Sequence, residues 1–74
     1  MKIISNTKKQ ILEEIQNNPT YGYTLAKKLD LPISFIYEHL RELREAGLIN
    51  YVEKDRKKIY QLTEKGTLLL KVIE

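Results

Sequence analysis

The sequence predicts a mainly α-helical domain that carries a two-stranded β-hairpin, an α+β arrangement. In three stretches between Ile4 and Leu43, apolar residues recur at intervals of three and four, as on the buried face of a helix. Between Gly47 and Thr63 they instead alternate with polar residues, which is typical of a half-buried strand. Helical spacing then returns. We therefore expect the order helix-helix-helix-strand-strand-helix.

The chain of 74 residues is expected to form a single domain at positions 1–74. It contains no internal repeat, low-complexity tract or linker that would divide it. A domain of this size buries only about 60% of the surface of its unfolded chain. Because its stability is then marginal, association into oligomers has to be considered.

The composition excludes several classes of function. There is no cysteine, and therefore no disulfide and no thiolate to act as metal ligand or nucleophile. The chain has one histidine and lacks an HExxH or phosphate-loop motif, which argues against a metal site and against an enzyme. We therefore expect no catalytic residue, no cofactor and no metal.

Targeting and charge add two weaker indications. No signal peptide and no run of about 18 apolar residues is present, which predicts a cytoplasmic protein that does not contact a membrane. The net charge of +3 and the pI near 9.2 mildly favour a polyanionic partner.

The first helix is predicted over residues 5–17. Thr7 and Gln10 have the spacing of a capping box at its start, and Ser5 is a competing first cap. The helix must end before the first proline, which disfavours helical backbone in the residue that precedes it. Its inward stripe contains one polar residue, Lys8, and the apolar residues Ile4, Ile11, Leu12 and Ile15.

The second helix is predicted over residues 22–29 and the third over residues 33–46. The sequence Asp-Leu-Pro separates them, and Gly47 stands where a left-handed C-terminal cap is expected. Each helix has an apolar stripe for the core. The stripes consist of Leu25, Ala26 and Leu29 in the second helix, and of Ile33, Ile36, Leu40 and Leu43 in the third.

An antiparallel hairpin is predicted over residues 48–62. Its two strands, 48–53 and 58–62, flank a tip at residues 54–57. One register places complementary residues opposite each other on the same face, which stabilises cross-strand pairs. In this register Glu53 faces Lys58, Tyr51 faces Tyr60, and Ile49 faces Leu62.

These elements form a winged helix-turn-helix in which the hairpin is the wing. Only about three residues join the second helix to the third, and this geometry allows the later helix to enter a DNA major groove. On periodicity alone, a plain pair of helices in a core explains the same spacing equally well.

Two motif-bearing stretches occur within residues 20–67, first YGYTLAKKLDLPISFIYEHLRELREAGLI and then YQLTEKG. They resemble the PadR-like family of bacterial and archaeal transcriptional regulators, and more loosely the MarR and ArsR groups. The L..L...GLI and Y.LT.KG pieces are shared by winged-helix regulators in general, whereas YGY and IY indicate PadR more narrowly. The resemblance implies a DNA-binding regulator in which Tyr37 lies on the DNA-facing helix.

The outer surface of the third helix is the candidate for reading DNA. Arg41 can pair with guanine O6 and N7, or form an ion pair with Glu45 one turn later. Glu38 can accept a hydrogen bond from cytosine N4, or remain a solvated partner of Arg41. Ser34 can donate to a phosphate, or support the start of the helix.

The aromatic residues of this helix have two interpretations each. Tyr37 either contacts DNA, as the PadR resemblance implies, or forms the edge of the core. Phe35 lies off the apolar stripe, so it either touches a thymine methyl group or lies over Tyr23 and the second helix. We expect His39 to be a half-buried structural residue rather than a ligand or a pH switch.

Basic residues are concentrated at the hairpin tip, where four of the 13 Lys and Arg residues occupy five positions. On a wing, such cations neutralise phosphates, although the same sequence also suits a solvated turn. A second basic pair lies on the helix expected to cross the DNA backbone. The tip cations are Lys54, Arg56, Lys57 and Lys58, and the basic pair is Lys27 and Lys28.

The last helix is predicted over residues 64–73, with Thr63 as its N-cap. Its apolar residues cover an arc too wide for one small domain to bury, which indicates an interface between two copies. A two-fold dimer would place two recognition helices one DNA turn apart and predicts a palindromic operator. The alternative is that this helix only docks on its own core. The expected dimer residues are Leu68, Leu69, Val72 and Ile73, joined by Ile3 and Ile4, with Leu70 outside their stripe.

Together these features predict a sequence-specific regulator of transcription that binds double-stranded DNA. Repression by occlusion is expected because so small a chain has no room for an activation domain. We expect no small-molecule effector. The alternative is a winged-helix protein-interaction module without sequence-specific DNA binding, which would need no basic wing.

Overall fold

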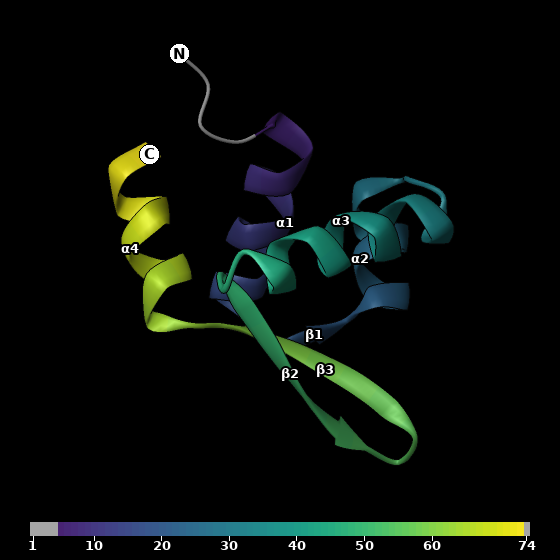
Figure 1. The fold of residues 1–74 in the computed structure, drawn as a ribbon. Coiled ribbons are helices and arrows are strands. Elements are labelled where there is room, and N and C mark those ends of the chain that lie inside the picture. The colour runs from purple at the N-terminus through teal and green to yellow at the C-terminus, as the bar shows by residue number, and fades with distance from the viewer. Residues whose placement is uncertain (1–4, 74) are drawn as a thin grey trace.

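The computed structural model describes residues 5–73 and confirms the predicted fold class (Figure 1). The α2 helix packs against both α1 and α3, the hairpin projects away from the helices, and α4 packs beside α1. No helix within residues 5–73 is both long enough and apolar enough to cross a membrane. In chain order the elements are α1 (Asn6–Asn17), β1 (Thr20–Tyr21), α2 (Gly22–Leu29), α3 (Ile33–Glu45), β2 (Ile49–Lys54), β3 (Lys57–Leu62) and α4 (Glu64–Ile73).

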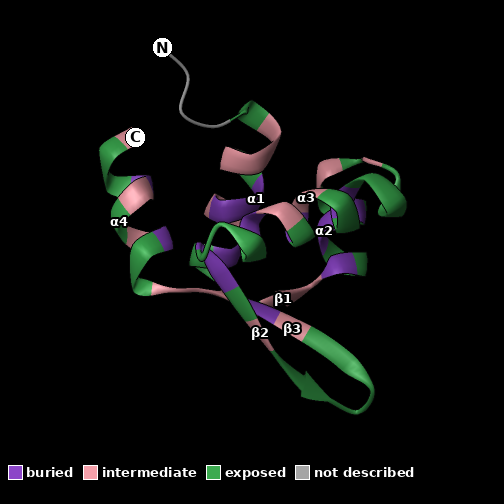
Figure 2. Ribbon diagram, viewed as in Figure 1, coloured by how far each residue is buried: buried purple, intermediate pink, exposed green. Residues whose placement is uncertain are grey.

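The core lies where the helices meet the base of the hairpin, whereas the projecting part of the hairpin is exposed (Figure 2). The stripes predicted for α1, α2 and α3 supply most of it. Ile33 was predicted to belong to this set but is 41% exposed. Helical side chains lean toward the N-terminus, and the first residue of a helix has no turn before it to cover. The buried apolar residues are Ile11, Leu12, Ile15, Leu25, Ala26, Ile36, Leu40, Leu43, Leu48, Ile49, Tyr60 and Leu70.

The prediction of a capping box that begins at Thr7 is wrong. Ser5 is the N-cap, and its hydroxyl oxygen accepts a hydrogen bond of 3.2 Å from the backbone N–H of Lys8. The earlier cap allows Thr7 to be a residue of the helix itself. The Lys8 ammonium lies 2.6 Å from a carboxylate oxygen of Glu42 on α3, which explains how a lysine occupies the inward stripe. Ile4 lies outside the described residues.

Both turns that flank α3 end the preceding helix with a residue in the left-handed conformation. Asp30 has φ 56°, and the N–H of Leu31 donates to the carbonyl of Ala26 at 3.0 Å. Gly47 has φ 78°, as predicted for a C-terminal cap, and the N–H of Leu48 donates to the carbonyl of Leu43 at 3.0 Å. The α3 helix itself ends at Glu45, one residue before the predicted end.

The hairpin has the predicted register, with all three cross-strand pairs in place. The Tyr51 and Tyr60 rings lie 5.7 Å apart between centroids. The tip is shorter than the predicted 54–57, because Lys54 pairs with Lys57 and the loop is Asp55 and Arg56 alone. Both loop residues have positive φ, as a two-residue hairpin turn requires, but the sequence lacks the glycine that usually indicates such a turn.

A third strand, β1, was not predicted. Thr20 pairs with Tyr60 and Tyr21 with Ile59, which gives the strand order β1-β3-β2. Two residues are too few to show a strand period in the sequence. This pairing connects the base of the wing to the residue that precedes α2.

The α4 helix is held against the end of α3 by polar contacts at its N-terminus. The Thr63 hydroxyl donates to the carbonyl of Gly47 at 2.6 Å and accepts from the N–H of Gly66 at 3.1 Å, which confirms Thr63 as the cap. The Lys65 ammonium donates to the carbonyl of Ala46 at 2.8 Å. Leu70, outside the predicted dimer stripe, is fully buried and anchors this helix in the core.

Candidate nucleic-acid interface

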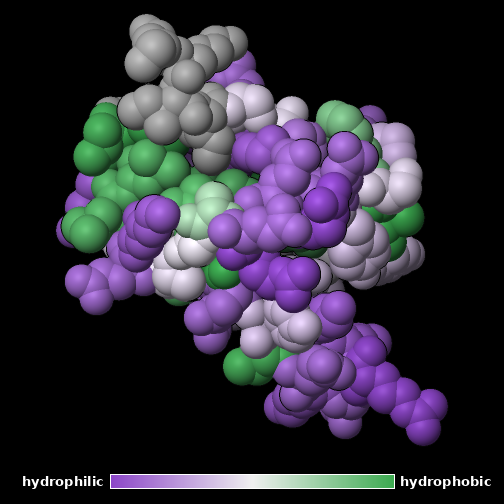
Figure 3. Space-filling model, viewed as in Figure 1, coloured by the Kyte–Doolittle hydropathy of each residue, from purple (hydrophilic) through white to green (hydrophobic). Residues whose placement is uncertain are grey.

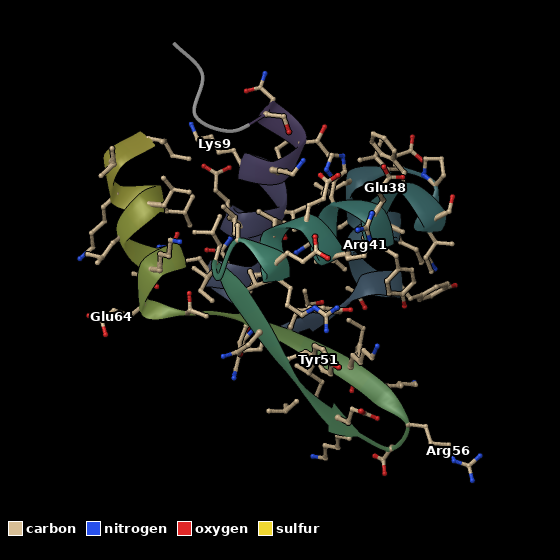
Figure 4. The ribbon with its side chains drawn as sticks, viewed as in Figure 1. Lys9, Glu38, Arg41, Tyr51, Arg56 and Glu64 are labelled. Carbon is tan, nitrogen blue, oxygen red and sulfur yellow. The ribbon has the colours of Figure 1, made fainter. Side chains whose placement is uncertain are left out.

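The five predicted DNA-reading residues of α3 are all exposed, because the buried residues Ile36, Leu40 and Leu43 fix the orientation of the helix. Figure 4 shows Glu38 and Arg41 on the outer side of α3. One guanidinium nitrogen of Arg41 lies 3.7 Å from the Glu45 carboxylate, and both side chains are more than half exposed. This exposed ion pair does not prevent Arg41 from reaching a DNA base. The five residues are Ser34, Phe35, Tyr37, Glu38 and Arg41.

The Phe35 ring makes a contact that the sequence did not indicate. It packs edge-on against the His39 ring, with 4.6 Å between centroids, and it remains 43% exposed. His39 is half-buried as predicted, and neither ring nitrogen has a hydrogen-bond partner among the described residues. Burial, and then the charge of Lys8, lower the pKa of His39. A neutral His39 is therefore part of the packing beneath the outer face of α3.

Glu42 is drawn away from the candidate interface. The hydrogen bond and the charge of Lys8 lower the pKa of the Glu42 carboxyl group. A carboxylate paired in this way with α1 does not lie free on the outer face, where it would repel phosphates.

The wing places its four cations in solvent, and Figure 4 shows Arg56 at the far end of the hairpin. Within residues 5–73 none of the four forms an ion pair. The Lys57 ammonium lies 5.3 Å from the Tyr21 ring centroid, and that of Lys58 lies 4.8 Å from the Tyr51 ring centroid. These cation–π contacts orient two of the cations without neutralising them.

A groove of about 780 Å³ lies between the wing and the helix-turn-helix. Three tyrosines from three elements line it, and three wing cations complete its wall. Its chemistry, aromatic rings and hydroxyl groups beside positive charge, suits a sugar–phosphate strand. We call it the tyrosine groove, and its lining residues are Tyr21, Tyr23, Thr24, Tyr37, Arg56, Lys57 and Lys58.

Sequence reasoning missed Tyr21, Tyr23 and Thr24 as members of this surface. The YGY motif was noted only as a mark of family resemblance. Tyr21 of this motif reaches the groove because β1 pairs with β3, and no pattern in the sequence indicated that pairing.

The basic pair on α2 is exposed but partly engaged. The Lys28 ammonium lies 3.1 Å from a carboxylate oxygen of Glu14 on α1. The Lys27 ammonium lies 5.5 Å from the Tyr23 ring centroid. Lys27 therefore lies beside a tyrosine that lines the tyrosine groove, whereas Lys28 is paired with a carboxylate of α1.

A second surface, on α4, is apolar. Leu68 and Val72 are 54% and 72% exposed, whereas Leu69 and Ile73 pack partly against the core. Figure 3 shows apolar surface gathered over α4, far from the hydrophilic wing. An open hollow of about 570 Å³ runs along this surface, with Leu43 and Leu48 in its floor. The other two predicted dimer residues, Ile3 and Ile4, lie outside the described residues.

No group of three or more histidine, aspartate or glutamate side chains within residues 5–73 is arranged to hold a metal ion. The exposed α3 face, the basic wing and the groove between them instead bring aromatic rings and positive charge together on one surface. Comparison with known families agrees with this description, since residues 5–51 match the family described as bacterial regulatory protein, arsR family. The chain belongs to the arsR family. It is therefore a regulator domain and not an enzyme.

Several solved structures share the fold of this arsR-family chain. ZitR from Lactococcus lactis has a TM-score of 0.91 at 22% identity, over 99% of this chain and 52% of that chain. The adhesin competence repressor AdcR from Streptococcus pyogenes has a TM-score of 0.90 at 18% identity, over 96% of this chain and 54% of that chain. The transcriptional regulator BldR from Sulfolobus solfataricus has a TM-score of 0.88 at 24% identity, over 93% of this chain and 52% of that chain.

These likenesses establish the winged-helix fold of the arsR-family domain. The chain spans about half the length of the ZitR, AdcR and BldR chains. A search of curated proteins finds no significant match. The family match establishes the arsR family. The narrower PadR-like resemblance, which rests on the YGY and IY motifs, stays a prediction.

Proposed function

We propose that this arsR-family domain binds double-stranded DNA in a sequence-specific manner and regulates transcription, most simply as a repressor that occludes its site. The observation that carries the proposal is the shared groove. The exposed face of α3 and the cations of the wing lie on either side of it. With α3 in a major groove, one sugar–phosphate strand would occupy the tyrosine groove and the wing would reach the next minor groove.

The wing tip supports the proposal independently. Arg56 has φ 65°, a conformation that glycine adopts without strain and arginine does not. Local rules of sequence and structure are most often broken at functional sites. We infer that an arginine stands at this position because its charge is needed for binding.

Within this interface we assign different roles to different residues. Arg41, with Glu38 beside it, reads base edges, whereas Ser34 and Tyr37 contact the backbone. Phe35 stands at the edge of the contact surface, against His39. We assign phosphate neutralisation to Lys27 and to the wing cations, and Lys28 contributes less because Glu14 already neutralises it.

We further propose that two copies associate through the apolar surface of α4, so that the preferred site is palindromic. The tyrosine at position 37 and the YGY motif favour a PadR-like mode of DNA contact within the broader family. No effector or metal is part of this proposal.

The proposal is tested by selection of bound sequences from a pool of random duplex DNA. The native chain should enrich one motif, and that motif should contain inverted half-sites. A variant with Lys54, Arg56, Lys57 and Lys58 changed to alanine should enrich the motif poorly under the same salt conditions. If the native chain enriches no motif and is eluted from nonspecific DNA at low salt, it is a protein-interaction module instead.

A further inference from the structure

Gly22, the first residue of α2, is in close contact with a side chain of α3. A Cβ atom at this position would lie 2.7 Å from Cε1, 2.9 Å from Cζ and 3.1 Å from the hydroxyl oxygen of Tyr37. Distances below 3.0 Å are not tolerated between carbon atoms, so any residue other than glycine would displace the Tyr37 ring. The rest of α2, the following turn and the first turn of α3 lie between the two residues in the chain.

The backbone at Gly22 does not itself require glycine. Gly47 has a left-handed φ, but Gly22 does not. A glycine at the beginning of a helix loses more conformational entropy on folding than another residue would. Room for the Tyr37 ring is therefore the feature of the structure that explains this glycine.

The ring that rests on Gly22 is not a core residue. Tyr37 is 45% exposed, and it lines the tyrosine groove together with Lys57 and Lys58. Its hydroxyl group makes no hydrogen bond to another described residue. Burial raises the pKa of the Tyr60 hydroxyl group, and the nearby Tyr37 raises it further, so the two tyrosines are close together near the base of the wing. A neutral hydroxyl beside ammonium groups is a donor for an anion.

We propose that Gly22 is a positioning residue for DNA recognition. It lets the Tyr37 ring lie against the start of α2, and this contact holds the Tyr37 hydroxyl at the tyrosine groove, where it donates to a phosphate of the bound strand. The inference rests on the proposed function and adds to it a device that fixes one backbone contact, and thereby the register of α3 on the duplex.

The test is a set of substitutions measured on the selected DNA site and by thermal unfolding. Tyr37→Phe removes only the hydroxyl, so affinity should fall about tenfold while Tm stays unchanged. Gly22→Ala displaces the ring and should cost a similar factor in affinity, with a lower Tm. In the Y37F background, Gly22→Ala should again lower Tm but should reduce affinity no further, because the hydroxyl is already absent.

The Y37A background provides a matched control for folding. With the ring removed, Gly22→Ala meets no obstacle, so the double variant should unfold at the same or a higher temperature than Y37A alone and should bind DNA equally well. This comparison also decides the case in which Gly22→Ala prevents the native chain from folding.

The inference is overturned if Tyr37→Phe binds the site as tightly as the native chain. It is overturned equally if Gly22→Ala lowers affinity by the same factor in the native and Y37F backgrounds, since Gly22 would then act on the fold alone. Either result leaves the proposed function intact. If the native chain enriches no DNA motif, both the inference and the proposed function are wrong.

Discussion

At the scale of single residues, His39 shows how packing leaves a polar side chain without partners. Its ring lies against Phe35, and both ring nitrogens are covered but not hydrogen-bonded within residues 5–73. Burial and the charge of Lys8 from α1 lower its pKa, while the Glu42 and Glu38 carboxylates on α3 raise it less strongly. The folded domain therefore favours neutral His39.

The stability of the domain should consequently depend on pH. Above the unfolded pKa of His39, near 6.5, the histidine is neutral in both states. Below it the unfolded chain takes up the proton first, so the free energy of unfolding falls as pH decreases through the lowered folded pKa. Because the chain has one histidine, a His39→Leu variant should lose the decline that begins below about pH 6.5. The free energy of unfolding of this variant should also be higher by about 1 kcal/mol, because the substitution removes the buried polar atoms that have no hydrogen-bond partner. Urea unfolding at several pH values measures both, and an equal decline in the variant would contradict the assignment.

Arg41 provides the test of base recognition. Arg41→Ala should weaken binding to the selected site by about 1–3 kcal/mol and binding to random duplex DNA much less, because a bidentate pair with guanine is lost. Competition binding with the two DNA types measures the difference. Equal weakening of both would make Arg41 a phosphate contact.

Glu45→Ala is the matched control for Arg41. It removes the ion-pair partner 3.7 Å from Arg41 and a negative charge near the DNA. Affinity for the selected site should therefore rise slightly, by about 0.2–0.5 kcal/mol, which is the typical contribution of such a helical pair. A loss of affinity would mean that the Arg41–Glu45 pair itself shapes the interface.

The sequence was informative about which residues face outward and poor at showing what they touch. Ile36, Leu40 and Leu43 determine the orientation of α3, so the exposure of Tyr37 and Arg41 could be predicted from the helical period. The contact between Tyr37 and Gly22 joins two helices across a turn, and no periodic pattern encodes such a contact.

At the scale of elements, predictions succeeded where a period or a set of complementary pairs defined the element. The register of the hairpin was predictable because the Tyr51–Tyr60 and Glu53–Lys58 pairs agree with each other. The start of α1 was not, because Ser5 and Thr7 are both competent caps. The short strand β1 was not predicted, because it is defined only by its pairing with β3.

The wing offers a prediction in which stability and binding change in opposite directions. Arg56→Gly relieves the left-handed conformation and should stabilise the domain by about 1 kcal/mol. It should also weaken binding to all DNA sequences alike and reduce the slope of log K against log salt by about 0.9, the value for one lost phosphate contact. Thermal unfolding and a salt titration of affinity measure the two effects.

Asp55→Gly is the control for this variant. Asp55 has φ 53°, so glycine relieves the same kind of strain at the adjacent position, but the substitution removes a negative charge instead of a positive one. It should stabilise the domain without weakening DNA binding. An unchanged salt slope for Arg56→Gly would remove the wing tip from the interface.

At the scale of the whole molecule, the basic and apolar surfaces are separated. The cations lie on the wing and beside the tyrosine groove, whereas exposed Leu68 and Val72 lie on α4 (Figure 3). A contiguous apolar patch on a small domain usually marks an interface. Two copies joined through α4 would keep both DNA-binding surfaces free.

The last prediction is that the chain forms a dimer through this patch. Leu68→Glu/Val72→Glu should abolish self-association without unfolding the domain, because these side chains are 54% and 72% exposed, whereas Leu70 holds α4 in the core. Lys71→Glu, an exposed charge change on the same helix, is the control and should leave the dimer intact. A dimer would set two α3 helices roughly 34 Å apart and double the phosphate contacts, so the double variant should also lose its preference for inverted half-sites. Sedimentation equilibrium across micromolar concentrations measures the mass. A native chain that remains at 8.8 kDa would exclude the dimer, and a dimer that survives the double substitution would place the interface on another surface.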